Sequence, residues 1–243
     1  MRPDAVQRVL DTELTAARHR RGGEPPRVLD VGGGTGVWAV QLAAAGCAVT
    51  VVDPSPDALA TLTRRAAEAG VADRVVAVQG DTDALGELVS DGAADLVLGH
   101  GLLEVVDDAA TALAALAAAA APGGAVSVLV ANRYAAVLHR AIGGRIVDAR
   151  KLLDDEGGQL AGTRDPLLRR FDVTGLETLV SSAGLAVEIL QGHGVVADLV
   201  PGAVLEANPG AAEALAELEL AAATRSPLRD VAARLHVLAR RTG

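Results

Sequence analysis

The sequence is almost devoid of aromatic residues, because Trp38, Tyr134 and Phe171 are the only three among 243. A core must therefore be built from the small and aliphatic residues that make up most of the 50% hydrophobic content. Lysine is equally scarce: Lys151 is the only one, so nearly all positive charge is arginine. Cys47 is the only cysteine, which excludes an internal disulfide and favours a reducing, cytoplasmic environment.

Long hydrophobic runs are missing as well. No segment approaches the ~20 uninterrupted apolar residues that a membrane-spanning helix needs. Residues 1–21 are polar and amphipathic without the apolar centre of a secretion signal, so we expect an N-terminal helix there. That helix either closes over a pocket or packs on a sheet. No His, Cys and carboxylate spacing indicates a metal site, and no Ser-His-Asp order indicates a hydrolase.

Positive charge is in the minority, and the formal net charge is −9. This balance argues against a protein coated with basic surface for nucleic acid. The segment 132–171 is the exception, since its positive residues outnumber its acids. We interpret it either as a solvated helical face or as a patch that receives an anionic substrate. The positive residues are Arg133, Arg140, Arg145, Arg150, Lys151, Arg164, Arg169 and Arg170.

Apolar runs alternate regularly with helix-like segments in the first half of the chain. We expect strands at 27–31, 48–53, 74–79, 94–99 and 125–131. Helices are expected between them, near 37–45, 56–69, 82–90 and 107–120. This rhythm is typical of right-handed βαβ units, and the nearly all-apolar strands suit a sheet that is covered on both faces. We therefore predict an α/β fold with a doubly wound parallel sheet.

The rhythm changes after the fifth run. Pro122, Gly123 and Gly124 predict a helix stop and a turn before the strand at 125–131. Residues 132–171 show no clear strand and are predicted to form a helical lid or substrate segment. We expect a single domain over residues 1–243. Its remaining elements are predicted at 171–192 (a helix and a strand), 213–225 (an acidic amphipathic helix) and 233–241 (a last strand).

The segment "RVLDVGGGTGVWAV" places glycines directly after the first expected strand. In open α/β sheets ligands bind at this turn, where a side chain would keep the ligand from the backbone. Gly32, Gly34 and Gly36 give G-x-G-x-G, but Val37 stands where a dinucleotide motif has its third glycine. Asp30, inside the strand, would repel a pyrophosphate, whereas it suits a ligand that carries an ammonium group.

Two further acids follow the next two expected strands. Asp53 ends the second strand, where a carboxylate can accept hydrogen bonds from both hydroxyls of a ribose. Asp81, or less favourably Asp83, can accept from the exocyclic amine of adenine, with the backbone of Thr82 beside the ring. Asp81 is equally suited to cap the following helix. A nicotinamide-dependent oxidoreductase also carries an acid at the Asp53 position, and the missing third glycine disfavours that alternative.

The spacing D-x-G-x-G-x-G resembles the signature of class I S-adenosylmethionine-dependent methyltransferases. The resemblance implies a Rossmann-like, seven-stranded and mostly parallel sheet whose last strand is antiparallel. It also implies S-adenosylmethionine as the cofactor. The residues that it assigns to cofactor binding are Asp30, Gly32, Gly33, Gly34, Gly36, Asp53, Pro54, Asp81, Thr82 and His100.

A longer stretch of the chain, roughly 27–241, resembles the bacterial tRNA 5-carboxymethoxyuridine methyltransferases. The likeness includes "ADLVLGHGLLEVVDD", Asn132 after the fifth strand, and the tail "ELELAAATRSPLRDVAARLHVLARR". It implies esterification of the carboxylate of a modified wobble uridine and makes Asn132 a catalytic candidate. The chain departs from that family after the sixth strand, where "GVVADLVPG" keeps only Asp198 of a cluster of aromatic, histidine and arginine residues.

The chemistry of the acceptor decides which side chains are needed. A carboxylate is already ionised at neutral pH and needs no base, so an arginine, Arg133 or Arg145, would orient it. A hydroxyl or an amine needs a base, and His100 at the end of the fourth expected strand is the candidate, with a packing role as its competing interpretation. The other histidines are His139 and His193, in less favourable positions, and His19 and His236, which we expect to be structural.

The leading hypothesis is therefore methyl transfer to an anionic acceptor, with a tRNA or a small molecule as the partner and no membrane. A small-molecule methyltransferase of secondary metabolism is the second hypothesis, which the low surface basicity favours. The third is a module that binds S-adenosylmethionine without catalysis.

Overall fold

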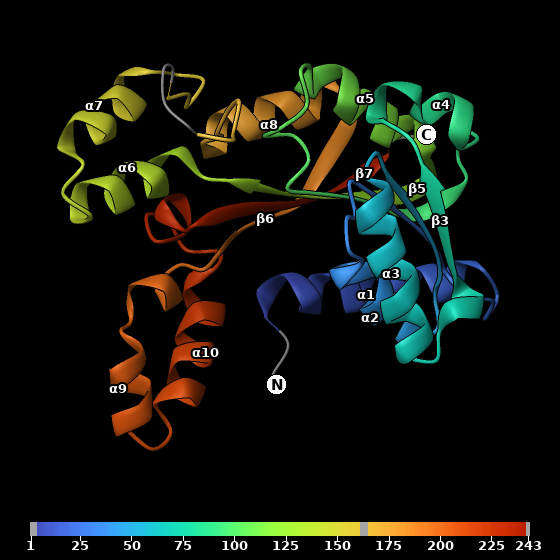
Figure 1. The fold of residues 1–243 in the computed structure, drawn as a ribbon, viewed down its shortest axis with the longest axis horizontal. Coiled ribbons are helices and arrows are strands. Elements are labelled where there is room, and N and C mark those ends of the chain that lie inside the picture. Colours follow the sequence, from blue (N-terminus) through green and yellow to red (C-terminus); the bar gives the residue numbers. More distant parts are fainter. Residues whose placement is uncertain (1–3, 161–164, 242–243) are drawn as a thin grey trace.

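The structure is a computed structural model that describes residues 4–160 and 165–241, and within them seven strands form one sheet (Figure 1). The strand order is β3-β2-β1-β4-β5-β7-β6. β1 to β5 pair in parallel, and β7 is antiparallel to both β5 and β6. The predicted doubly wound sheet with an antiparallel last strand is confirmed. The strands are β1 (Arg27–Val31), β2 (Ala48–Asp53), β3 (Val75–Gln79), β4 (Ala94–His100), β5 (Ala120–Ala131), β6 (Leu185–His193) and β7 (Arg234–Arg241).

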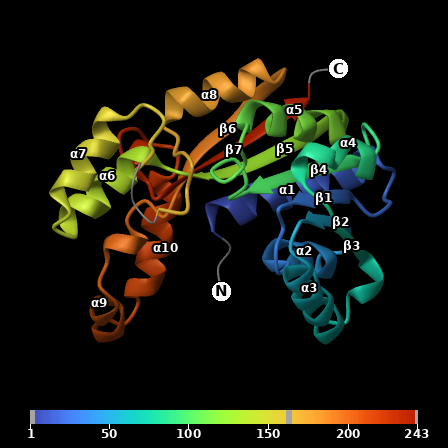
Figure 2. The ribbon, with the colours of Figure 1, turned by 45° about the horizontal axis from the view of Figure 1, so that its top comes forward.

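Helices cover both faces of the sheet (Figure 2). One face, here called the α1 face, carries α1 (Ala5–Arg20), α2 (Val37–Ala44) and α3 (Pro56–Glu68). The other, the α5 face, carries α4 (Leu85–Leu88), α5 (Ala109–Ala119) and α8 (Val173–Ser182). Because successive strand residues point to opposite faces, the apolar strands feed two cores, and both are packed almost wholly with Ala, Val and Leu.

Two predicted boundaries are wrong. β5 begins at Ala120, so Pro122, Gly123 and Gly124 lie inside the strand rather than in a turn before it. The pairing with β4 jumps from Ala120 to Ala125, and the extra residues bulge out of the ladder with Gly123 at φ +71°. The helix expected at 82–90 is a 3-10 turn at Thr82–Ala84 followed by the short α4, which contains the poor helix former Gly86.

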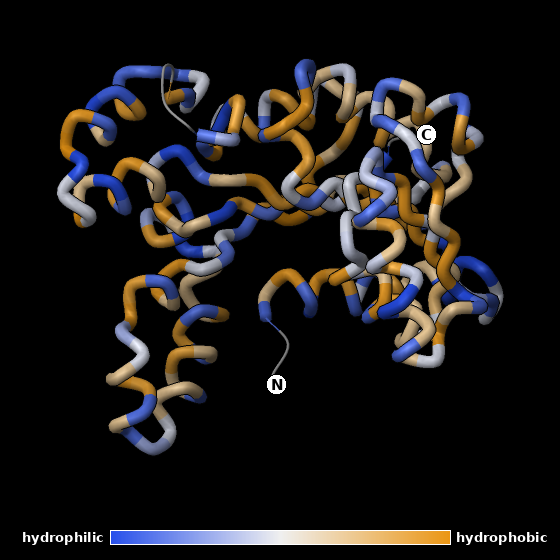
Figure 3. Tube along the Cα trace, viewed as in Figure 1, coloured by the Kyte–Doolittle hydropathy of each residue, from blue (hydrophilic) through white to orange (hydrophobic). Residues whose placement is uncertain are grey.

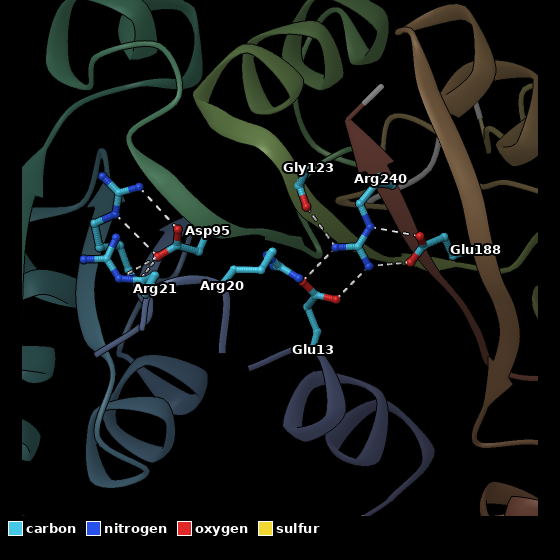
Figure 4. A network of polar contacts seen from close by, with 8 residues as sticks. Glu13, Arg20, Arg21, Asp95, Gly123, Glu188 and Arg240 are labelled. Atoms are coloured by element: carbon cyan, nitrogen blue, oxygen red, sulfur yellow. Dashed lines mark hydrogen bonds and ion pairs between the residues drawn. The ribbon is translucent and has the colours of Figure 1, made fainter. Parts of the chain in front are cut away.

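The N-terminal helix packs on the sheet, which decides between the two interpretations of residues 1–21. Val6 and Leu10 of α1 are fully buried in the core of the α1 face. Glu13, also buried, accepts hydrogen bonds from Arg20 at 2.6 Å and from both terminal nitrogens of Arg240 on β7 at 2.9 and 2.8 Å (Figure 4). Arg240 also binds Glu188 of β6, and this hydrogen bond holds the pKa of Glu188 below its ordinary value.

Two helical segments leave the sheet at the edge where the parallel strands end (Figure 1). α6 (Arg133–Ile142) and α7 (Ile146–Asp154) follow β5, and α9 (Gly202–Ala207) and α10 (Ala211–Ala222) lie between β6 and β7. Hydrophobic residues concentrate along the central strands, whereas hydrophobic and hydrophilic residues alternate along α9 and α10 (Figure 3). The remaining short elements are 3-10 turns at Ala72–Arg74, Ala197–Leu199 and Arg229–Val231.

None of the helices in the described ranges is long and apolar enough to cross a membrane.

Candidate active site

A cavity of about 320 Å³ opens at the carboxyl ends of β1, β2, β3 and β4. This is the place where the order of the strands reverses, between β1 and β4, and where open α/β sheets bind ligands. Five of the predicted cofactor residues line it: Gly32, Asp53, Pro54, Asp81 and Thr82. The loop after β4 closes the opposite side with Gly101 and residues 105–107.

The glycine loop shapes this cavity more than it lines it, because Gly33, Gly34 and Gly36 do not face the cavity. Gly36 has φ +77°, and a Cβ there would lie 2.2 Å from Leu62 Cδ1. A Cβ on Gly33 would lie 2.5 Å from Asp30 Oδ2. Any larger residue at either position would lift the loop away from β1 and α3.

Asp53 links the glycine loop to the end of β2. One carboxylate oxygen accepts the backbone N–H of Gly34 at 2.8 Å, and the other accepts that of Ser55 at 2.9 Å. The side chain is buried, with 7% exposed, and it lines the cavity. Each carboxylate oxygen can accept more than one hydrogen bond, so both retain a lone pair for a further donor in the cavity.

Asp81 serves as the helix cap that the sequence allowed, and it also lines the cavity. Its Oδ1 accepts the backbone N–H of Thr82 at 2.6 Å. Thr82 is buried and its neighbour Asp83 lines the same cavity, so both acids considered for the adenine position reach it.

Asp30 lies beneath the glycine loop on the α1 face and does not line the cavity. It is 2% exposed, and its Oδ2 has no hydrogen-bond partner among the described residues. Burial, and secondly the negative charge of Asp53, raises the pKa of Asp30 from 3.8 to about 7. A buried carboxylate without a partner fits a cationic ligand group.

His100 ends β4 and has its ring on the α1 face, where it stands edge-on to Trp38 with ring centroids 5.1 Å apart. Its Nε2 lies 2.8 Å from Ser127 Oγ of β5, and Nδ1 is buried without a partner among the described residues. Burial and the nearby charges of His236, Arg234 and His193 lower the pKa of His100 well below 6.5, so the imidazole is neutral.

The other two catalytic candidates have partners inside the scaffold. Asn132 caps α6 by accepting the N–H of Tyr134, and its amide donates to the carbonyls of Asp230 and Ala232 at 2.9 and 2.8 Å. Arg133 donates to Asp172 at 2.7 Å, and its guanidinium lies 4.8 Å from the centre of the Tyr134 ring. These contacts tie the start of α6 to the turn before β7 and to α8.

Most of the basic residues of 132–171 also make contacts within the protein. This is neither the solvated helical face nor the patch for an anionic substrate that the sequence suggested. Arg140 and Arg170 both bind Asp165, and Arg150 binds Asp154. Arg145 and Lys151 are exposed and are not paired in the described ranges. Arg164 lies outside the described residues.

Sequence reasoning missed Arg169, which holds the loop after β4. Its guanidinium donates to the backbone carbonyls of Leu103 at 2.8 Å, Asp107 at 2.7 Å and Val106. Val106 and Asp107 line the cavity, so Arg169 sets one wall of it from a distant part of the chain. The only signal in the sequence was its membership of the basic segment.

We expect Arg169→Ala to weaken the binding of S-adenosylhomocysteine about tenfold, because loss of the hydrogen bonds to the loop costs ~1.4 kcal/mol or more. Isothermal titration calorimetry measures this change. Arg150→Ala is the matched control, since Arg150 forms an exposed pair in the same segment. Equal affinity of the Arg169 variant and the wild type would show that the loop holds its place without this side chain.

Sequence reasoning also missed Arg234, because β7 runs antiparallel and its first residue therefore lies at the edge where the parallel strands end. Arg234 is exposed, and its guanidinium has no hydrogen bond or ion pair in the described part of the chain. Its positive charge contributes to lowering the pKa of His100 and of the buried Glu104, although burial raises the pKa of Glu104 on balance.

A second cavity, of about 300 Å³, lies between the start of α1, the end of β6 and α10. Three carboxylates line it, from Asp4, Asp198 and Glu219. Glu219 accepts the backbone N–H groups of residues 195–197 at 2.6 to 2.9 Å. This lining is unsuited to an anionic ligand. No cluster of three or more His, Cys, Asp or Glu residues that could hold a metal is present within 4–160 and 165–241.

Comparison with known proteins agrees with this geometry. A family model described as "Methyltransferase domain" matches residues 4–189. The chain belongs to the methyltransferase-domain family. The matched residues include the glycine loop and all the acids that surround the cavity. The family that the residues resemble, that of the methyltransferases, is therefore confirmed.

A curated relative of this methyltransferase is the tRNA 5-carboxymethoxyuridine methyltransferase of Escherichia coli strain K12, which is 30% identical over 139 residues. The match covers 57% of this chain, and the chain spans about half (52%) of the length of that relative.

Solved structures share the fold at low sequence identity. An S-adenosylmethionine-dependent methyltransferase from Mesorhizobium loti has a TM-score of 0.61 at 20% identity, covering 97% of both chains. Magnesium protoporphyrin IX methyltransferase from Synechocystis PCC 6803, solved with bound S-adenosylhomocysteine, has a TM-score of 0.60 at 15% identity, covering 97% of this chain and 83% of that one. S-adenosylmethionine, the cofactor expected from the residues, is named for the first of these structures, and S-adenosylhomocysteine is bound in the second.

Proposed function

We propose that this methyltransferase holds S-adenosylmethionine through the acids at the ends of β1, β2 and β3 and transfers its methyl group to a carboxylate acceptor. The observation that carries the proposal is the convergence of Asp30, Asp53 and Asp81 at neighbouring strand ends. Each acid matches one part of the donor: the ammonium group, the ribose and the adenine amine.

The residues present fit this cofactor. Asp53 keeps a free lone pair on each oxygen toward the cavity, which suits two ribose hydroxyls. Asp30 is a buried carboxylate with an unpaired oxygen, which a cationic group would satisfy. When bound, S-adenosylmethionine supplies a sulfonium-activated methyl group that a nucleophile can take in one displacement.

The protein positions the methyl donor and the acceptor and forms no covalent bond to either. We assign Asn132 and Arg133 to holding α6 in position, because their polar groups bind Asp230, Ala232 and Asp172. Arg234 replaces Arg133 as the cation that orients the acceptor, since it is exposed near His100 and forms no ion pair with the described residues. Arg145, at the start of α7, stays the second candidate for that role.

The carboxylate of carboxymethoxyuridine in tRNA is the first acceptor to test, on the strength of the Escherichia coli relative. A small carboxylic acid is the second candidate, and one observation favours it. The basic residues that would contact phosphates largely form ion pairs within the protein instead, with Asp165, Asp154 and Asp172. We also propose a cytoplasmic location, supported by the single, buried thiol of Cys47.

The experiment incubates the full chain with methyl-labelled S-adenosylmethionine and either bulk tRNA that carries carboxymethoxyuridine or a panel of small carboxylic acids. Label that enters tRNA as a base-labile methyl ester supports the first acceptor. Label that enters only the panel supports the second. Contacts between a protein and nucleic-acid phosphates are strongest at low salt. Absence of label in tRNA at low as well as moderate salt would therefore exclude tRNA as the acceptor. Binding of NAD in place of S-adenosylhomocysteine in calorimetry would overturn the cofactor.

A further inference from the structure

We infer that a hydrogen-bond relay across four strands holds His100 as the tautomer with its proton on Nδ1, so that its Nε2 lone pair is occupied and His100 is not a base. The inference rests on the proposed function, because it selects the acceptor class for the same site. It assigns positioning roles to Ser127, His236 and Gln191.

The relay runs through the interior of the sheet on the α1 face. Gln191 Nε2 of β6 lies 3.0 Å from His236 Nδ1 of β7. His236 Nε2 lies 2.8 Å from Ser127 Oγ of β5, and the same oxygen lies 2.8 Å from His100 Nε2 of β4. Ser127 and His236 are fully buried and Gln191 is 4% exposed, so water does not compete for these contacts.

Both imidazoles of the relay are neutral. Burial, followed by the charge of His193, lowers the pKa of His236 to about 3, and burial likewise lowers the pKa of His100. The charged and titratable groups near the relay are Arg234 at the start of β7 and His193 at the end of β6. A neutral imidazole has one donor nitrogen and one acceptor nitrogen, so each ring has one of two tautomers.

The direction of the relay follows from the single proton of the Ser127 hydroxyl. That hydroxyl can donate to only one of the two rings and must accept from the other. The Nε2 amide of Gln191 can only donate, so Nδ1 of His236 accepts and its Nε2 carries the proton. His236 therefore donates to Ser127, which donates to Nε2 of His100 and leaves the His100 proton on Nδ1.

The consequence reaches the active site, because the lone pair that a base would need is occupied. Nε2 of His100 accepts from Ser127, and Nδ1–H is a buried donor without a partner in the described ranges. The edge-on contact with Trp38 keeps the ring in this orientation. His100 is followed by Gly101, which lines the cavity. A site whose histidine cannot act as a base suits a nucleophile that is already ionised, such as a carboxylate.

The test measures the histidine tautomers directly, by long-range ¹H–¹⁵N correlation spectra of the full ¹⁵N-labelled chain at neutral pH. We expect His100 to show a protonated Nδ1 and a bare Nε2, and His236 to show the reverse. Single His→Gln variants assign the signals. A protonated Nε2 on His100 in the wild type would overturn the inference.

Gln191→Glu is the decisive variant, because a carboxylate accepts from Nδ1–H of His236 and reverses every donor in the relay. The His100 signals are then expected to switch to the Nε2–H form. Gln41→Glu, exposed on α2, is the matched control and is expected to leave the His100 signals unchanged.

If Gln191→Glu does not fold, Ser127→Ala provides the second test. It cuts the relay without adding charge, and we expect His100 to become a mixture of both tautomers. Retention of pure Nδ1–H in that variant would contradict the relay. The tautomer spectra need no acceptor, so failure to find methyl transfer would count against the proposed function and leave this result standing.

Discussion

Asp53→Ala is expected to abolish measurable binding of S-adenosylhomocysteine, with a loss of affinity of at least ~100-fold. Two effects combine. The variant loses the carboxylate oxygens proposed for the ribose hydroxyls, and hydrogen bonds to a charged group contribute ~1.5–3 kcal/mol each. It also frees the backbone N–H groups of Gly34 and Ser55, which Asp53 now holds at 2.8 and 2.9 Å, so the glycine loop loses its tie to β2.

Calorimetry with S-adenosylhomocysteine measures this loss, and thermal unfolding reports whether the fold is retained. Asp57→Ala is the matched control, because Asp57 is an exposed acid four residues further along that does not line the cavity. Unchanged affinity of Asp53→Ala would place the ribose elsewhere. Loss of affinity in both variants would show that net charge, rather than the position of Asp53, governs binding.

Asp30→Asn is expected to stabilise the ligand-free protein above neutral pH while weakening the binding of the methyl donor. Burial raises the folded-state pKa of Asp30 from 3.8 to about 7. A carboxyl group whose pKa is raised on folding contributes stability that is fully present below pH 3.8 and is lost as the pH rises through about 7. The linked loss amounts to ~4 kcal/mol across that window.

Asparagine has the same shape and stays neutral, so the variant does not undergo that loss. Urea unfolding at pH 8 is therefore expected to show Asp30→Asn more stable than the wild type by up to ~4 kcal/mol, with a smaller difference of ~1.6 kcal/mol at pH 5. Asp73→Asn, which replaces an exposed acid, is the control and should show no pH-dependent gain. A variant that is less stable than the wild type at pH 8 would mean that the ionised Asp30 has a partner in the folded state.

The same titration links Asp30 to the cofactor. A cationic donor favours the ionised carboxylate, so wild-type affinity for S-adenosylmethionine is expected to rise between pH 6 and pH 8 with release of a proton. In Asp30→Asn the affinity should be lower and should not rise over that range. Calorimetry in two buffers of different ionisation enthalpy measures the proton directly.

Much of the cofactor site could be predicted from the sequence because its signals are local. Apolar runs that end in glycine or aspartate mark the carboxyl ends of strands, and parallel strands bring those ends to one edge. Asp53, Pro54, Asp81 and Thr82 accordingly line one cavity. The prediction of a turn at Pro122–Gly124 was wrong for the opposite reason. Whether those residues form a strand or a turn depends on pairing with β4 near Ala94, which lies elsewhere in the chain.

The roles of the charged and catalytic candidates could not be predicted in the same way. Arg133 and Asn132 follow β5 as expected, but Asp172 and Ala232, which bind them, are 39 and 100 residues away. Arg169 reaches Val106 across 63 residues. Periodicity shows which face a residue occupies, and it does not show which side chain of another element meets it.

The sequence by itself determined a layered sheet with a glycine turn and acids at successive strand ends, because backbone geometry and burial are encoded in neighbouring residues. Only the tertiary structure decided that Arg133 is bound to Asp172, that Arg234 lies exposed at the same edge, and that His100 is linked to His236 through Ser127. Ser127 and His236 are 109 residues apart, and the β5–β7 pairing brings them together. That pairing depends on the order of the strands, which is a property of the whole core rather than of any segment.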